Sequence, residues 1–86
     1  MLRRRIVVQL KNGLQAQVAT EFVRQASLYT SDINILKNGR LSVAKSIISV
    51  MCLAIRNGEE VILIADGIDE QKAIQELGEF ISCNSK

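Results

Sequence analysis

The sequence predicts an α+β fold in which a four-stranded antiparallel sheet carries three helices on one face. Four short segments have the alternating or continuous apolar character of strands, two longer segments repeat apolar residues at helical spacing, and turn-forming residues separate them. Together with a short apolar segment in the middle of the chain, predicted as the second helix, these observations give the order β-α-β-β-α-β-α. The 86 residues are expected to form one domain, residues 1–86.

The first strand and the first helix lie on either side of a glycine-containing turn. Apolar residues alternate in residues 5–10, and residues 11–13 then end the run with turn chemistry. In residues 16–28 the apolar positions recur every three or four residues, with polar side chains between them. An amphipathic helix that packs by one face is predicted there.

A hairpin is predicted around the dipeptide Asn38-Gly39, which best tolerates the positive φ angles of a type I′ turn. The alternating apolar residues that flank it are Ile33, Ile35, Leu41 and Val43. Two short strands joined by a two-residue turn follow from this pattern.

The middle segment, residues 47–55, fits a helix or a strand by its apolar length alone. Ser46 as an N-cap and Asn57-Gly58 as an exit favour a short helix. Such a helix is apolar nearly all round, so two interpretations stay open. It is either fully buried or it exposes a docking patch. The candidates for that patch are Ile47, Ile48 and Met51.

The last strand and the last helix complete the order. Residues 61–65 are continuously aliphatic and are predicted to form a central strand between two turns. Asp69 is expected to cap the final helix. The apolar stripe of that helix consists of Ala73, Ile74, Leu77, Phe80 and Ile81. Gly78 is expected to weaken the helix by about 1 kcal/mol relative to alanine.

Composition excludes several classes of chemistry. The chain has no histidine, which removes the commonest general base and the commonest metal ligand. It also has no paired carboxylates, metal-ligand spacing or glycine-rich phosphate loop, so no enzymatic activity, metal or cofactor is expected. Two isolated cysteines, the lack of a signal peptide and the lack of a membrane-spanning apolar run indicate a cytoplasmic protein.

Charge is distributed unevenly along the chain. Residues 1–56 hold nine basic and two acidic residues, whereas residues 57–86 hold two basic and seven acidic ones. This asymmetry fits a surface for nucleic acid or an acidic protein, or simply solvated faces that interleave in the fold. The basic residues that would contact nucleic acid are Arg3, Arg4, Arg5 and Lys11. Because aromatic residues for base stacking are almost absent, no direct nucleic-acid partner is expected.

Ser46 has two interpretations. As a plain N-cap, its hydroxyl accepts a backbone N–H bond worth about 1 kcal/mol. A phosphate added there would meet free N–H groups and the positive end of the helix dipole, with Lys45 as a nearby cation. Helix physics permits a phosphorylation switch at this position and does not by itself establish one.

Several ordered segments resemble the HPr family, the small phosphocarrier proteins of the bacterial sugar phosphotransferase system. These segments are GLQAQVATEFVRQA, KNG, VAKSIISVMCLAI and GEEVILIADGIDEQKAI, and the resemblance runs from about residue 4 to residue 82. The most specific parts are AKSI at 44–47 and the G-L-x-A frame at 13–16. The resemblance implies an HPr-like open-faced β-sandwich, in agreement with the order predicted above.

The same resemblance implies a vacated phosphohistidine site. HPr carriers accept phosphate on a histidine at the position that is Gln15 here, and an amide nitrogen is not a useful nucleophile. The family's arginine is replaced by Gln17, and its first-turn proline by Val18. Histidine phosphotransfer is therefore not expected.

The regulatory half of the family pattern is retained. In Gram-positive relatives a serine that matches Ser46 is phosphorylated by a bifunctional HPr kinase/phosphorylase, and the phosphoprotein is a co-repressor for the catabolite control transcription factor. The aliphatic patch that those partners contact maps onto Ile47, Ile48 and Met51. The Crh group, which also has glutamine in place of the histidine, is the most similar. Crh proteins usually keep the arginine at the position of Gln17, and this arginine helps to bind the transcription factor.

Two function hypotheses follow. The first is a non-catalytic regulatory module, phosphorylated on Ser46 and active in carbon catabolite repression, with metabolic enzymes as further candidate partners. The second is a phosphorylation-independent module derived from a phosphocarrier, which docks through the patch and Arg24 on an enzyme or transporter subunit. The predicted partner-binding residues are Arg24, Lys45, Ile47, Ile48 and Met51.

Overall fold

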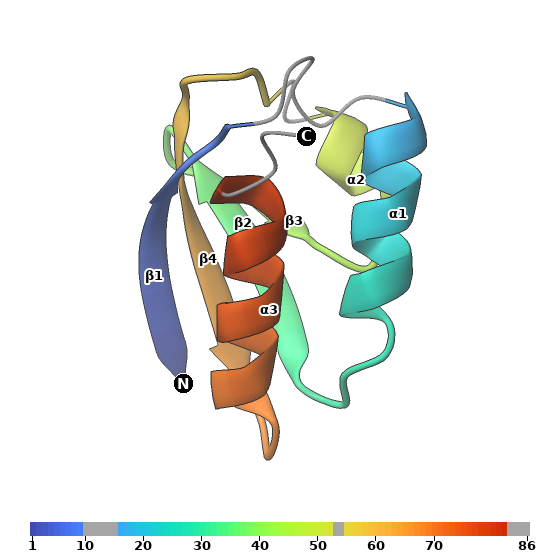
Figure 1. The fold of residues 1–86 in the computed structure, drawn as a ribbon, viewed down its shortest axis with the longest axis vertical. Helices are drawn as coiled ribbons and strands as arrows, with labels where there is room; N and C mark the ends of the chain where they lie inside the picture. Colours follow the sequence, from blue (N-terminus) through green and yellow to red (C-terminus); the bar gives the residue numbers. More distant parts are fainter. Residues whose placement is uncertain (10–15, 53–54, 83–86) are drawn as a thin grey trace.

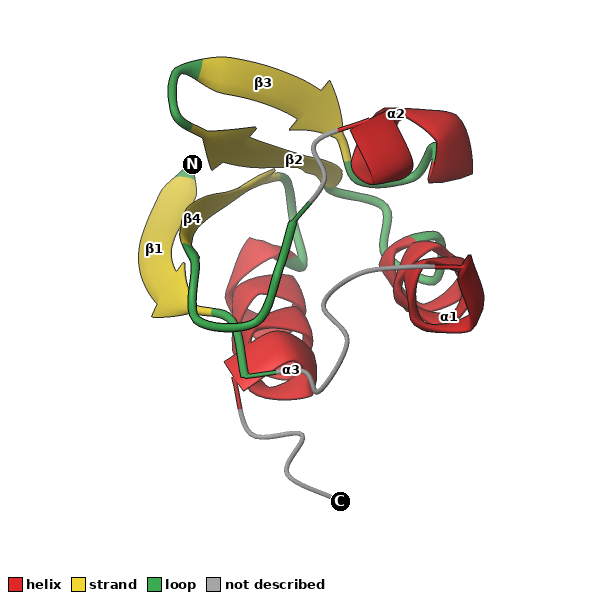
Figure 2. Cartoon of the chain, turned by 90° about the horizontal axis from the view of Figure 1, so that it is seen from above, coloured by secondary structure: helices red, strands yellow, loops and turns green. Residues whose placement is uncertain are grey.

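The computed structural model describes residues 1–9, 16–52 and 55–82. The elements are β1 (Leu2–Val7), α1 (Ala16–Ala26), β2 (Asp32–Lys37), β3 (Arg40–Val43), α2 (Ile47–Cys52), β4 (Glu60–Asp66) and α3 (Glu70–Ser82). Their order confirms the predicted β-α-β-β-α-β-α succession. The helices α1 and α3 lie on one side of the sheet, and α2 lies beside α1 at the β3 edge (Figures 1 and 2).

The four strands form one antiparallel sheet in the order β1-β4-β2-β3. β4 lies in the interior of the sheet, as its aliphatic sequence predicts. Its residues Val61, Leu63 and Ala65 are buried beneath the helices together with Ile33 and Ile35 of β2. Successive side chains on a strand point to opposite faces, so the other half of the aliphatic run lies on the open face of the sheet.

The first strand begins earlier than predicted. It covers Leu2–Val7 instead of residues 5–10 because it pairs with β4 from Leu2 opposite Ala65 to Val7 opposite Glu60. The partner strand therefore sets the limits of β1. Ile6 and Val8 are buried, as the alternation predicts. Leu10 lies outside the described residues.

The three consecutive arginines belong to β1 and do not form one patch. Arg3 and Arg5 point to the open face, whereas Arg4 points toward α3, where a Cβ at Gly78 would lie 3.1 Å from its Nη1 atom. The same Cβ would lie 3.2 Å from Cδ1 of Ile6. Gly78 therefore has a packing role that its helix propensity does not predict, because it lets β1 approach α3 closely.

The hairpin turn has the predicted geometry. Asn38 has φ 51° and Gly39 has φ 79°, the left-handed values of a type I′ turn. Lys37 and Arg40 close the turn as the last pair of the β2–β3 ladder. The first helix ends at Ala26, two residues before the predicted limit, where the Ser27 amide and hydroxyl both donate to the Val23 carbonyl (2.9 and 2.8 Å).

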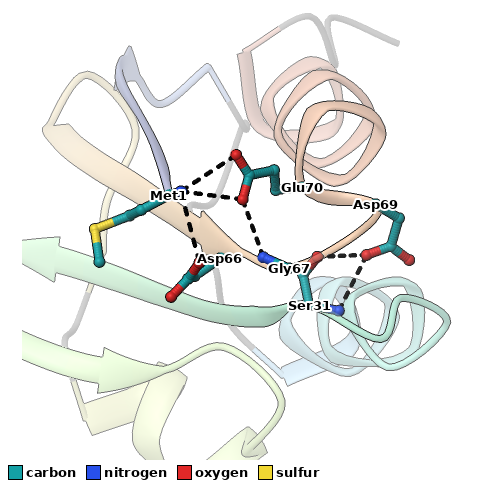
Figure 3. A network of polar contacts seen from close by, with 6 residues as sticks. All are labelled: Met1, Ser31, Asp66, Gly67, Asp69 and Glu70. Atoms are coloured by element: carbon teal, nitrogen blue, oxygen red, sulfur yellow. Dashed lines mark hydrogen bonds and ion pairs between the residues drawn. The ribbon is translucent and has the colours of Figure 1, made fainter.

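Asp69 precedes α3 as predicted, but its carboxylate bonds to a different turn. It accepts hydrogen bonds from the Ser31 amide (3.0 Å) and the Ser31 hydroxyl (Figure 3). It also accepts a hydrogen bond from the Thr30 amide (3.0 Å). The hydrogen bond from the Ser31 hydroxyl is the largest cause that lowers the pKa of Asp69 to about 2. Asp69 therefore ties the α1–β2 turn to the start of α3.

A second carboxylate holds the β4–α3 turn. Glu70 accepts a hydrogen bond from the Gly67 amide (3.0 Å), and this is the largest cause that lowers the pKa of Glu70. Glu70 and Asp66 also lie 3.1 and 3.5 Å from the Met1 amino group (Figure 3). The turn between β4 and α3 is thus held from both of its ends.

Candidate regulatory site at the start of α2

Ser46 occupies the N-cap position of α2, as predicted. Its Oγ accepts a hydrogen bond from the Ser49 amide (3.3 Å), and its carbonyl accepts the Val50 amide (3.0 Å). The side chain is half-buried. The hydroxyl is therefore positioned by its own helix and still borders the surface.

The helix α2 exposes one apolar side and buries the other. Ile47, Ile48 and Met51 are 39%, 77% and 47% exposed, whereas Val50 is fully buried. Full burial of this helix, one of the two interpretations left open above, is therefore wrong for these three residues. They form what we call the α2 patch, which follows Ser46 directly in the chain.

The two predicted basic residues have local structural partners. Lys45 donates from Nζ to the Tyr29 carbonyl (2.8 Å), which connects the β3–α2 turn to the end of α1. Arg24 is exposed and pairs with Glu21 on the same helix (3.5 Å). Neither contact involves the Ser46 hydroxyl, and both leave the α2 patch uncovered.

The carbonyl that accepts the hydrogen bond from Lys45 belongs to Tyr29, a residue anchored in the core. Tyr29 is buried, and its hydroxyl donates to the Glu76 carboxylate. Burial, followed by this hydrogen bond, raises the pKa of Tyr29 to about 12. The contact from Lys45 thus joins the beginning of the α2 region to an anchored part of the core.

The vacated phosphohistidine site stays a prediction. Gln15 lies outside the described residues, and of Gln17 the structure describes the backbone alone, within the first turn of α1. Val18, in place of the family's proline, is partly buried against the core. The part of the site that can be described is therefore the helix that follows it.

The open face of the sheet carries apolar side chains that were not predicted. Ile62 of β4 lies there beside Leu36 of β2, which in turn pairs with Leu41 of β3. Ile64 and Val43 lie on either side of Asn34. The signal was present, because a continuous aliphatic run such as residues 61–65 is typical of a strand covered on both faces.

The described residues contain no group of three or more cysteine, aspartate or glutamate side chains placed to hold a metal ion. None of their helices combines the length and the apolar character needed to cross a membrane.

Comparison with known proteins connects this geometry to a family. The family model of the PTS HPr component phosphorylation site matches residues 2–82. The HPr-like protein Crh of Bacillus subtilis (strain 168) is 44% identical over 81 residues, which are 94% of this chain and 95% of that protein. Crh of Halalkalibacterium halodurans is 46% identical over 81 residues, 94% of this chain and 96% of that protein.

Solved structures give the same result. The phosphocarrier protein HPr of Bacillus anthracis has a TM-score of 0.93 at 38% identity and matches over 94% of this chain and 96% of its own. A crystal structure of Bacillus subtilis Crh, an intertwined dimer with a swapping domain, has a TM-score of 0.75 at 45% identity over 93% of this chain and 92% of its own.

Proposed function

The chain belongs to the HPr family, and on that premise we propose that it is a non-catalytic cytoplasmic regulatory protein, phosphorylated on Ser46 by an HPr kinase/phosphorylase. The modified protein acts in carbon catabolite repression as a co-regulator of a catabolite control transcription factor. Histidine phosphotransfer is not part of this function, because the chain has no histidine.

The observation that carries the proposal is the direct succession of Ser46 and the exposed α2 patch. In the kinase reaction the Ser46 oxygen forms a bond to the γ-phosphorus of ATP, the bond to the bridging oxygen breaks, and ADP leaves. The hydroxyl proton passes to a base of the kinase. The product carries a charge of about −1.5 to −2 beside a cluster of exposed aliphatic side chains. A partner with a basic group next to an apolar groove would recognise both features together.

Phosphorylation is tested with a purified HPr kinase, ATP and mass spectrometry of the intact chain and its peptides. We expect one phosphoryl group, located on Ser46 and lost in Ser46→Ala. Ser49→Ala is the matched control, because Ser49 is also a half-buried serine of the same helix region and its replacement leaves the Ser46 hydroxyl in place. An unmodified chain, or a Ser46→Ala chain that is still modified, would contradict the proposal.

Recognition through the α2 patch is tested by calorimetric titration of the transcription factor with the phosphorylated chain. Ile48→Ala should weaken binding by about 1 to 2 kcal/mol if this side chain is buried in the complex. Leu28→Ala is the matched control, because Leu28 is equally exposed (77%) and lies in the α1–β2 turn. Equal losses for the two variants would argue against the patch.

The exposure of the α2 patch in the unmodified chain also favours the second candidate function, docking without phosphate. The same titration separates the two. If unmodified and phosphorylated chains bind a partner with the same affinity and Ile48→Ala weakens both, the phosphorylation-independent module is correct and the proposed switch is not.

A further inference from the structure

The strand β1 forms an open edge of the sheet. The strand order β1-β4-β2-β3 gives it one neighbour, and no other described element lies along its outer side (Figures 1 and 2). An edge strand presents backbone N–H and C=O groups that can pair with another chain. Which groups of β1 face outward therefore decides what this edge can bind.

The alternation of the ladder identifies the outward-facing groups. In an antiparallel pair, residues that exchange both hydrogen bonds alternate with residues that exchange none. The Val8 amide donates to the Glu59 carbonyl (2.8 Å), which sets the phase of the alternation. The phase at the far edge agrees, because the Ala44 amide donates to the Ile33 carbonyl (2.9 Å). The residues of β1 that bond to β4 are accordingly Leu2, Arg4 and Ile6. Those whose amides and carbonyls face outward are Arg3, Arg5 and Val7.

The other edge of the sheet, β3, is less suited to accept a further strand. It has four residues, whereas β1 has six. Its Val43 carbonyl already accepts the Ser46 amide (3.3 Å). It carries one arginine, Arg40, which closes the hairpin turn. The β1 edge is therefore the longer and the more strongly charged of the two.

Arginine side chains border the β1 edge on both faces of the sheet. Arg3 and Arg5 lie on the open face, Arg4 lies on the helix side, and all three are exposed. Arg5 has an exposed partner in Glu60 (3.7 Å). Arg3 and Arg4 have no hydrogen-bond or ion-pair partner among the described residues. A strand added to this edge would therefore meet positive charge on both of its faces.

The occupant that fits these charges is an extended acidic segment of another protein. Successive side chains of a strand alternate between the faces, so three consecutive carboxylates would lie opposite the three arginines. Cross-strand pairs of opposite charge stabilise a sheet, and like charges directly opposite each other destabilise it. A second copy of β1 is thus a poor occupant, because antiparallel pairing centred on the arginines brings like charges together. Beyond the arginines, Val7 is 46% exposed and offers an apolar contact.

We propose that the β1 edge binds an extended acidic segment of a partner protein by strand addition. The outward-facing backbone groups supply the hydrogen bonds, and the three arginines select carboxylates at consecutive positions of the added strand. The α2 patch lies at the opposite edge of the sheet, beside β3 (Figure 2). The two surfaces are therefore separate, and this inference does not depend on modification of Ser46.

Fluorescence anisotropy with a short labelled peptide tests the binding to the full chain. The peptide has blocked ends and contains threonine, valine, threonine, three glutamates and threonine, in this order. Antiparallel addition places its valine opposite Val7 and its glutamates opposite the arginines. We expect saturable binding, and none for the peptide that has lysines in place of the glutamates. A chain that does not bind the glutamate peptide overturns the proposal.

A charge exchange tests the register of the added strand. Arg3→Glu should weaken binding of the peptide about threefold to tenfold, and lysine in place of the glutamate opposite position 3 should restore it. Arg40→Glu is the matched control, because it makes the same change of charge at the opposite edge. It should change the affinity by less than about twofold at physiological salt. Equal losses for the two variants would overturn the proposal.

N-methylation of the peptide separates strand addition from simple attraction of charges. A methyl group on the amide opposite Arg5 removes an N–H that faces β1, and it should weaken binding about tenfold. A methyl group on the amide opposite Arg4 removes an N–H that faces away, so it should leave the affinity nearly unchanged. Because both peptides carry the same charges, equal affinities of the two overturn the proposal.

Amide hydrogen exchange, measured by NMR, locates the contact on the chain. Saturation with the peptide should slow exchange at the amides of Arg3, Arg5 and Val7. The amides of Arg4 and Ile6 already bond to β4 and should exchange slowly with or without the peptide. Protection confined to other elements overturns the proposal. A single-stranded oligonucleotide that binds more tightly than the peptide would overturn it as well and assign the arginines to nucleic acid.

Discussion

At the scale of single residues, two turns of the molecule pack closely against each other. Ser31 is completely buried although it is polar, and its hydroxyl and amide both donate to Asp69. Gly67 follows β4 directly at this point. A Cβ at Gly67 would lie 2.6 Å from the Ser31 Oγ and 2.7 Å from its Cα. Glycine is needed here for space, because the backbone of the neighbouring turn cannot move away without breaking the contacts of Asp69.

We therefore predict that Gly67→Ala lowers the free energy of unfolding by about 1–3 kcal/mol, the usual cost of overpacking. Denaturant unfolding measures it. Gly78→Ala is the comparison and should cost less, since the atoms that its Cβ would meet at 3.1 and 3.2 Å are side-chain ends that need to shift only by a few tenths of an ångström, and alanine favours the helix. Equal stability of Gly67→Ala and the parent chain would show that the two turns can separate without cost.

At the scale of elements, the local signals predict most of what the structure contains. The hairpin turn, the order of the elements and the N-cap at Ser46 all depend on neighbouring residues, so a single sequence suffices to find them. The limits of β1 depend on its pairing with β4, and the role of Gly78 depends on Ile6 of a distant strand. Such features follow from long-range packing, which periodicity does not report.

The turn itself gives a test at this scale. Asn38 has a positive φ of 51°, which a side chain with a Cβ adopts at a cost and asparagine tolerates best. Asn38→Ala should destabilise the chain by about 1 kcal/mol, whereas Asn38→Gly should stay within a few tenths of the parent. Thermal unfolding gives both values. Asn57→Ala is the matched control, because Asn57 also precedes a glycine. Among the described residues, however, Asn38 is the one non-glycine residue with positive φ. A similar loss at Asn57 would contradict the explanation.

One part of the candidate site could be predicted, because it depends on residues that are neighbours in the chain. Another part depends on long-range packing and could not. Ser46 and the three residues of the α2 patch follow each other in the chain, so sequence order alone brings them together. The exposed fractions of Ile47, Ile48 and Met51 could not be predicted, since they depend on where α1 and β3 pack against α2. The apolar residues on the open face of the sheet were missed because they come from three strands, and only the pairing register brings them together.

At the scale of the whole molecule, the carboxylate contacts make stability depend on pH. Hydrogen bonds to Asp69 lower its pKa to about 2, below the value of about 3.9 for an unfolded aspartate. A lowered pKa in the folded state stabilises the fold above the unfolded pKa, and this contribution is lost as pH falls. The pKa values of Glu59 and Glu70 are lowered as well, by hydrogen bonds from Lys37 and from the Gly67 amide.

We accordingly expect the free energy of unfolding to fall as pH is lowered from about 4 to about 2. Asp69→Asn should flatten this dependence, because the amide does not titrate. Glu79→Gln, at an exposed position of α3, should keep it. Urea unfolding at a series of pH values measures both. An acid slope that Asp69→Asn leaves unchanged would assign the dependence to other carboxylates.

The position of β1 at the edge of the sheet has a consequence for biosynthesis. Among the described strands it pairs with β4 alone, and Val7 can pair only after Glu60, roughly 50 residues later, has been synthesised. At a synthesis rate of about 5–20 residues per second, the strand waits roughly 3 to 10 s on the ribosome. Three consecutive arginines make the waiting segment soluble and self-repelling. The charges that the fold divides between the two faces of β1 are therefore expected to oppose premature pairing of this strand with other nascent chains.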